Sequence, residues 1–112
     1  MDEWIKNIPH AKSLDLTEQI KYETGKVVRK TLVQRSSVGI ILFAFDAGES
    51  VSAHTVPGDA MAHILDGEAE VTIGGKVHWV TAGHVIVMPA GVSHAVRALT
   101  PFKMLLTVVK ES

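Results

Sequence analysis

The chain has 112 residues, of which 46% are hydrophobic and 21% are charged, and its formal net charge is −1. These values fit one folded domain with a single hydrophobic core and exclude an intrinsically disordered chain. The balanced charge gives no electrostatic reason to expect nucleic acid or a membrane as a partner. Because the sequence contains no cysteine, disulfides and thiolate chemistry are excluded as well.

No segment of the sequence predicts membrane insertion or export. The apolar runs, such as residues 39–45, are too short to span a bilayer. The first twelve residues contain two acids and lack the apolar stretch of a signal peptide. We therefore expect a cytoplasmic protein.

The first 25 residues form the least regular part of the pattern. We expect residues 1–25 to be an N-terminal arm that packs on a domain formed by residues 26–112. Within the arm, residues 13–22 form either a helical turn capped by Asp15 or Thr17, or an irregular stretch.

Short apolar segments separated by turn signals follow the arm. From Gly58 onward, glycine or proline turns recur about every eight to ten residues, which is typical of an antiparallel sandwich or barrel. We therefore predict an all-β domain. The expected strands are residues 26–34, 39–46, 69–80 (a hairpin), 85–88, 94–99 and 102–109.

Three of these strands carry more specific expectations. The pair Gly74-Gly75 supplies the positive φ angles of a tight hairpin turn. The continuous apolar run 85–88 predicts a strand that is covered on both faces. We place Trp79 either in the core or at a contact between subunits.

Two spaced motifs give the chain a family resemblance. The first has Gly48, five residues and then His54, and closes at Gly67. A second motif has Gly83, Pro89, Gly91 and His94. On the residues of both motifs, the chain resembles a small single-domain cupin, an RmlC-like jelly-roll barrel also called a double-stranded β-helix. The resemblance covers roughly residues 26–109.

The second motif matches the family pattern more fully than the first. It places Gly83, Pro89, Gly91 and His94 at the family spacing, and Ala98 stands where the family has asparagine. The proline and glycine bend the chain before the strand that His94 begins.

The resemblance also implies a metal site with four ligands, two of which are present here. By position, His54 is the first ligand and His94 the last, while Val56 replaces the second histidine and Ala60 replaces the glutamate. Catalytic zinc usually has three protein ligands, and oxygenase iron has two histidines and a carboxylate. The expected cofactor is therefore either none or one divalent ion of Fe, Mn, Ni or Zn.

Strand alternation argues against a replacement ligand from His63. Counted back from Gly67, the side chains of Ala60, Ala62 and Ile64 share one face, so His63 faces the other way. For His78 and His84 we favour surface or structural positions.

Three functions stay open at this point. The first is the binding of a small organic molecule in a barrel pocket lined by His54, Val56, Ala60, Ala62 and His94. The alternative is a divalent-metal-dependent oxygenase or isomerase in which His54 and His94 are residual metal ligands. A third, metal-free version uses one of these histidines as a general base. The resemblance implies a homodimer.

Overall fold

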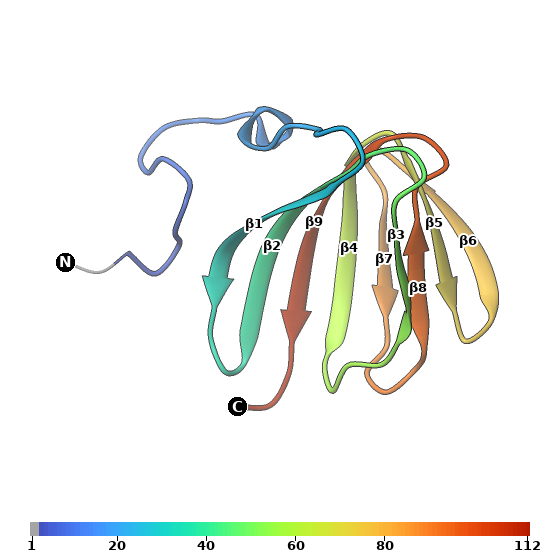
Figure 1. Ribbon diagram of the computed structural model, residues 1–112. Helices are drawn as coiled ribbons and strands as arrows, with labels where there is room; N and C mark the ends of the chain where they lie inside the picture. Colours follow the sequence, from blue (N-terminus) through green and yellow to red (C-terminus); the bar gives the residue numbers. More distant parts are fainter. Residues whose placement is uncertain (1–2) are drawn as a thin grey trace.

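Two antiparallel sheets face each other in the computed structural model, which describes residues 3–112 (Figure 1). Sheet A has the strand order β1-β2-β9-β4-β7, and sheet B has the order β3-β8-β5-β6. This arrangement confirms the predicted all-β jelly-roll barrel. The strands are β1 (Val27–Gln34), β2 (Val38–Phe45), β3 (Ser50–His54), β4 (Asp59–Asp66), β5 (Glu68–Ile73), β6 (Lys76–Thr81), β7 (Val85–Met88), β8 (His94–Arg97) and β9 (Phe102–Val109).

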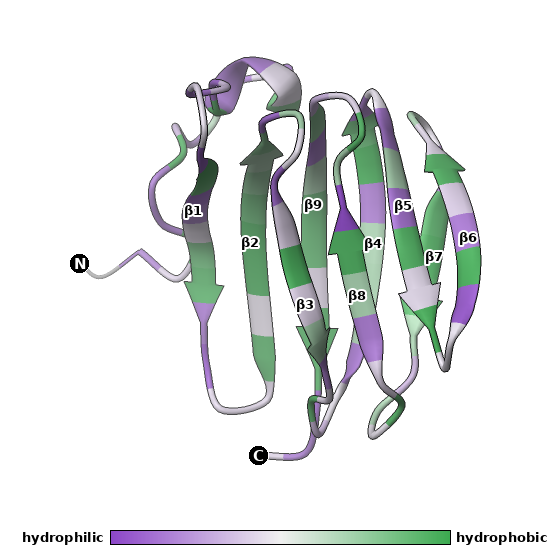
Figure 2. Cartoon of the chain, turned by 45° about the vertical axis from the view of Figure 1, so that its right-hand side comes forward, coloured by the Kyte–Doolittle hydropathy of each residue, from purple (hydrophilic) through white to green (hydrophobic). Residues whose placement is uncertain are grey.

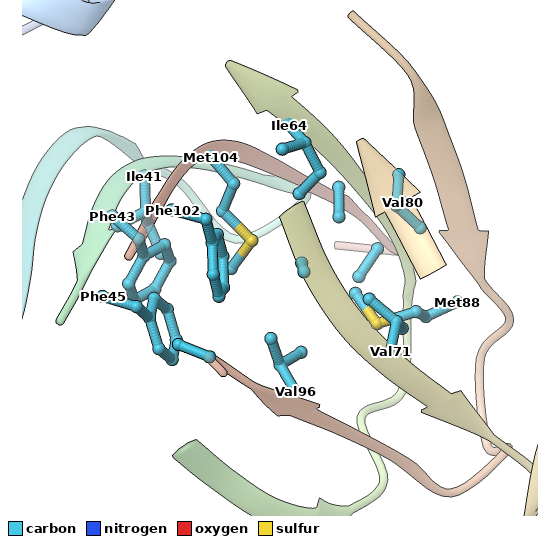
Figure 3. Packing of buried hydrophobic residues seen from close by; sticks show 14 residues of the cluster. Ile41, Phe43, Phe45, Ile64, Val71, Val80, Met88, Val96, Phe102 and Met104 are labelled. Carbon is cyan, nitrogen blue, oxygen red and sulfur yellow. The ribbon is translucent and has the colours of Figure 1, made fainter. Parts of the chain in front are cut away.

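The hydrophobic core fills the space between the two sheets. Strand alternation sends every second side chain of β4, β5 and β9 into this space. Figure 3 shows Phe43, Phe45 and Phe102 together on one side of the core, with Val71 and Met88 on the other. The rings of Phe45 and Phe102 stack with centroids 4.6 Å apart. We call the part of the interior around these three phenylalanines the phenylalanine end.

The hairpin between β5 and β6 has the predicted glycine turn. Gly74 has φ 55° and Gly75 has φ 83°, conformations that side chains other than glycine rarely adopt. The turn pairs Ile73 directly with Lys76, and the register continues to Val71 opposite His78. The turn type therefore determines which side chains of β6 point into the barrel.

The N-terminal arm lies against the outer face of sheet A. Its one helical element is a 3-10 turn, η1 (Leu16–Gln19), and the backbone N–H of Thr17 donates to the Asp15 carboxylate over 3.0 Å. Of the two alternatives for this segment, the structure therefore has the helical turn with Asp15 as its cap. No helix within residues 3–112 is long and apolar enough to cross a membrane. Ile20 of the arm forms a second buried cluster with four residues of β1 and β2, namely Leu32, Val33, Leu42 and Ala44.

The structure corrects the strand prediction in several details. Val85 and Val87 of β7 are 54% and 49% exposed, so this strand is covered on one face only. Trp79 is 52% exposed, so of its two expected positions the core is wrong, and a contact between subunits stays a prediction. Strand β7 is an edge of sheet A, and β6, which carries Trp79, is an edge of sheet B. No described segment covers the outer faces of these two strands. The prediction also missed β3, because Ser50–His54 is short, polar and exposed throughout and shows no apolar alternation.

Candidate functional site

Two histidines meet at the opposite end of the barrel from the phenylalanines. His54 ends β3 and His94 begins β8, and the two residues are register partners. Their ring centroids lie 4.5 Å apart, with 67° between the ring planes. A register irregularity between Val51 and His54 brings His54 opposite His94. We call this region, around His54 and His94, the histidine end.

The loops next to the two histidines are tied to each other. Gly91, with φ 73°, donates its backbone N–H to the carbonyl oxygen of Val56 over 2.9 Å. The Asp59 carboxylate accepts the backbone N–H of Ala90 over 2.8 Å. The Asp59 carboxylate therefore holds a loop in place through this hydrogen bond.

His94 is a buried imidazole with an unmet hydrogen-bonding requirement. Its side chain is 5% exposed, and its Nδ1 atom is buried without a partner. Burial lowers the pKa of His94, and the neighbouring His54 lowers it further, while weak hydrogen bonding to the Val92 backbone acts in the opposite direction. The Val92 contact lacks the geometry of a well-formed hydrogen bond, so Nδ1 still counts as unpaired. The ring is therefore neutral at neutral pH, with one nitrogen as donor and the other as acceptor.

His54 differs from His94 in exposure and in its contacts. The side chain is exposed, and its Nδ1 lies 2.9 Å from the carbonyl oxygen of Ser52. Because a carbonyl oxygen only accepts, this contact places the hydrogen of the neutral ring on Nδ1. The Nε2 atom of His54 is then left as an acceptor for another group.

The other predicted pocket residues lie on the connection after His54 and on the strand that follows it. Val56 is half-buried in the loop between β3 and β4, and Ala60 and Ala62 are buried in the core cluster. Ala60 pairs with Met88 on one side and with Val108 on the other. Their small side chains give this part of the interior apolar walls.

The residues present do not fit the four-ligand metal centre of the family. Within residues 3–112, no three His, Cys, Asp or Glu side chains lie where they could hold one metal ion together. Two imidazoles are fewer than the three protein ligands that catalytic zinc and oxygenase iron sites use. We therefore derive no reaction step through a metal.

The remaining histidines of the prediction lie apart from this pair. Ala60, Ala62 and Ile64 are buried on the inner face of β4, which confirms the alternation that turns His63 outward. His84 is exposed, and its Nδ1 hydrogen-bonds with the Thr81 hydroxyl over 3.1 Å.

His78 is half-buried and faces the interior, which excludes the surface position and leaves the structural one of the two that were expected. It lies opposite Val71, which is fully buried in the core, and shares its strand face with the buried Val80. Its neighbours Val77 and Trp79 are exposed on the outer face. Figure 2 shows the hydropathy of the residues changing from one position to the next along β6. The Gly-Gly turn contained the necessary signal, because it pairs Ile73 with Lys76 and therefore Val71 with His78.

Two hollows on the surface of the described residues lie away from the histidine pair. One, of about 910 Å³, lies between the arm and β1 beside Trp4 and Arg35. The other, of about 340 Å³, lies on sheet B beside the ion pair of Glu70 and Arg97. We therefore define the candidate site by the unpartnered His94 nitrogen and the ring beside it, and not by a surface hollow.

Comparison with known proteins gives matches over most of the chain. Residues 41–109 match the cupin domain family. A conserved Streptococcus pyogenes protein of unknown function is 47% identical, with a TM-score of 0.96 over 99% of this chain and 97% of that chain. A cupin superfamily protein of Desulfitobacterium hafniense is 34% identical, with a TM-score of 0.91 over 96% of this chain and 98% of that chain.

Two further relatives are matched over part of their length. A cupin 2 conserved barrel domain protein of Leptotrichia buccalis is 40% identical, with a TM-score of 0.84 over 87% of this chain and 47% of that chain. An uncharacterised protein of Streptomyces coelicolor is 31% identical over 62 residues, which are 55% of this chain and 59% of that protein.

Proposed function

This chain belongs to the cupin family, and we propose that it binds a small, partly apolar organic molecule at the pair of His54 and His94. The observation that carries the proposal is the buried Nδ1 atom of His94, which has no hydrogen-bond partner. A buried polar group left unpaired costs about 1–3 kcal/mol. A polar atom of a ligand placed against this nitrogen would recover that free energy.

The surroundings of the pair indicate what kind of molecule would fit. Val56 and Ala60 stand where the family has a histidine and a glutamate, so the walls beside the two imidazoles are apolar. Ligand sites of this kind combine apolar walls with a few well-placed polar groups. The His94 nitrogen and the free Nε2 acceptor of His54 are the polar groups here. We therefore expect a ligand with an apolar body and a carboxyl or hydroxyl group at the histidine end.

The experiment is an NMR titration that follows the ring signals of the histidines. Chelator-treated protein is titrated with hexanoate, benzoate, hexanol and p-cresol, and the titration is repeated after adding Zn(II) or Fe(II). We expect at least one probe to shift the His54 and His94 signals without metal. In His94→Phe we expect the apparent Kd of that probe to rise at least tenfold. His10→Ala, which removes an exposed histidine of the arm, is the matched control and should bind as wild type.

The possible outcomes separate the candidate functions. If no probe shifts either histidine with or without metal, the binding proposal is wrong. Binding that requires Zn(II) or Fe(II) would favour the alternative, a divalent-metal-dependent oxygenase or isomerase in which His54 and His94 are the residual ligands.

We also propose that the protein is a homodimer that pairs through the uncovered part of sheet A. Met61, Val85, Val87 and Val109 are exposed there, and Met61 and Val87 are direct cross-strand partners. The arm buries the other part of this outer face, so a contiguous apolar area is left beside the free edge of β7. Exposed apolar areas of this kind mark protein contacts. Light scattering at micromolar concentration should give a dimer mass, and Val87→Lys should give a monomer.

A further inference from the structure

We infer that the outer face of sheet B carries a second binding site, which takes a neutral sugar ring with its apolar face on Trp79. This site is separate from the proposed binding at the histidine pair, because His94 and its partner His54 belong to the inner face of the same sheet. Its parts are a surface hollow, an ion pair in the wall of the hollow and an exposed indole.

The hollow lies over three strands that are side by side in Figure 2, namely β3, β8 and β5. Val71 and Val96 are buried partners on the inner face, so the residues next to them along β5 and β8 face outward. The short side chain of Ala95 leaves room there. The polar side chains around this room are Ser50, Ser52, Glu70, Thr72 and Arg97. The volume of about 340 Å³ lies within the range of small-molecule sites, which is about 300–1,000 Å³.

An ion pair holds two of these polar groups in place. The Nε and Nη2 atoms of Arg97 donate to Oε2 of Glu70 over 2.9 and 2.7 Å, and the Glu70 side chain is only 13% exposed. The Oε1 atom of Glu70 and the Nη1 atom of Arg97 lie outside these two bonds, so they offer an acceptor and a donor to a ligand. Because the pair has no net charge, it favours hydroxyl groups, which both donate and accept, over a phosphate or an ammonium group.

Trp79 provides the apolar part of the site. It is the direct partner of Glu70, and directly opposed residues share a face with Cβ atoms about 4.5–5.5 Å apart. The indole is 52% exposed and therefore lies beside the hollow with its ring accessible. A pyranose ring has a face of C–H groups and a rim of hydroxyl groups. The C–H groups are attracted to the negative face of an indole, while the hydroxyl groups reach the fixed donor and acceptor.

The position of the ion pair favours a small ligand over a second copy of the chain. One row of direct partners crosses all four strands of sheet B, and its members are Trp79, Glu70, Arg97 and Ser50. The ion pair therefore occupies the middle of the face. The core of a protein interface is depleted of charged residues. A hydroxylated ligand can instead hydrogen-bond to the pair while the rest of the face stays in water.

The test follows the indole N–H signal of Trp79 in NMR titrations with methyl β-glucoside, methyl β-galactoside and methyl α-mannoside. The chain has two tryptophans, so Trp4→Phe leaves the Trp79 signal alone and serves as the reference protein. We expect at least one glycoside to shift this signal saturably at millimolar concentrations. Methyl β-glucuronide, which adds a carboxylate, should bind no more tightly than methyl β-glucoside.

Three variants of the reference protein locate the bound glycoside. Thr72→Val removes a hydroxyl group of the hollow without changing its shape and should raise the apparent Kd at least threefold. Trp79→Leu should abolish saturation transfer from the protein to the glycoside. Thr107→Val is the matched control and should bind as the reference protein, because Thr107 pairs with the exposed Met61 on the outer face of sheet A.

The sugar site is overturned if no glycoside moves the Trp79 signal or if Thr72→Val binds as tightly as the reference protein. Tighter binding of the glucuronide would overturn the neutral class of ligand. A dimer that dissociates in Trp79→Leu, without any glycoside binding, would assign the face to a second copy instead. These results leave the histidine pair to its own titration with His94→Phe. Unchanged melting temperatures identify the variants that have folded.

Discussion

The two ends of the barrel interior are built from opposite kinds of contact. At the phenylalanine end, Phe45 and Phe102 are fully buried, and their rings stack on each other. At the histidine end, His94 is nearly as buried, but its Nδ1 has no partner. The comparison teaches that one end of this small core stabilises the fold, while the other keeps an unmet hydrogen bond that a ligand can complete.

The largest effect is expected at the phenylalanine end. Phe102→Ala removes a fully buried ring from the stack with Phe45 and leaves a cavity. We expect the free energy of unfolding to fall by about 3–5 kcal/mol, measured by urea denaturation. A loss below about 1 kcal/mol would mean that this end does not dominate stability as the comparison requires.

A glycine at the same end provides a backbone test. Gly67 has φ 76°, and a methyl group added there would overlap the carbonyl oxygen of Pro101. Gly67→Ala should lower the free energy of unfolding by about 2–4 kcal/mol, since it combines backbone strain with a steric overlap. Gly75→Ala is the matched control, because Gly75 has φ 83° with open space around it. Equal losses in the two variants would show that the close approach at Gly67 contributes nothing.

A substitution at the histidine end should raise the free energy of unfolding, whereas the substitutions at the phenylalanine end lower it. His94→Phe replaces the unpaired buried nitrogen by an apolar ring of similar shape. We expect the free energy of unfolding of the ligand-free protein to rise by about 1 kcal/mol, because the cost of the unpaired group disappears. Urea denaturation measures this change, and a clear loss of stability would mean that the buried imidazole already has a partner in solution.

The smallest effect is a dependence on pH. The pKa of folded His94 is lowered, chiefly by burial, so the unfolded chain binds the proton more readily. The free energy of unfolding is therefore not reduced by protonation of this group above the unfolded pKa of about 6.5. It decreases as the pH falls from there toward the folded pKa. Denaturation of wild type between pH 5 and 7.5 should show this slope, and His94→Phe should reduce it. An identical slope in both proteins would assign the effect to another group.

The sequence predicted the fold because turn chemistry and motif spacing act locally. Gly74-Gly75 and the run from Pro89 to His94 produced the hairpin and the strand start where they were expected. The errors arose where tertiary context decides. Trp79 and the side chains of β7 are of the types usually found in a hydrophobic core. They belong to the edge strands β6 and β7, however, whose outer faces are uncovered.

The candidate site was predicted in part for the same reason. The spacing of the motifs singled out His54 and His94, and the structure brings their rings into contact. The spacing did not indicate that the His94 nitrogen lacks a partner, since this depends on how segments distant in the sequence pack around it. His78 could have been assigned to the interior from the hairpin register, which pairs it with Val71.

The two hydrogen bonds between the loops of the histidine end bear on the kinetics of binding. Gly91 N–H to the Val56 carbonyl and Ala90 N–H to the Asp59 carboxylate join the segments that follow His54 and precede His94. The conformational entropy of bringing the two rings together is therefore lost during folding and not during recognition. A ligand meets a preformed pair of imidazoles, so related ligands should associate at similar rates and differ mainly in how long they stay bound.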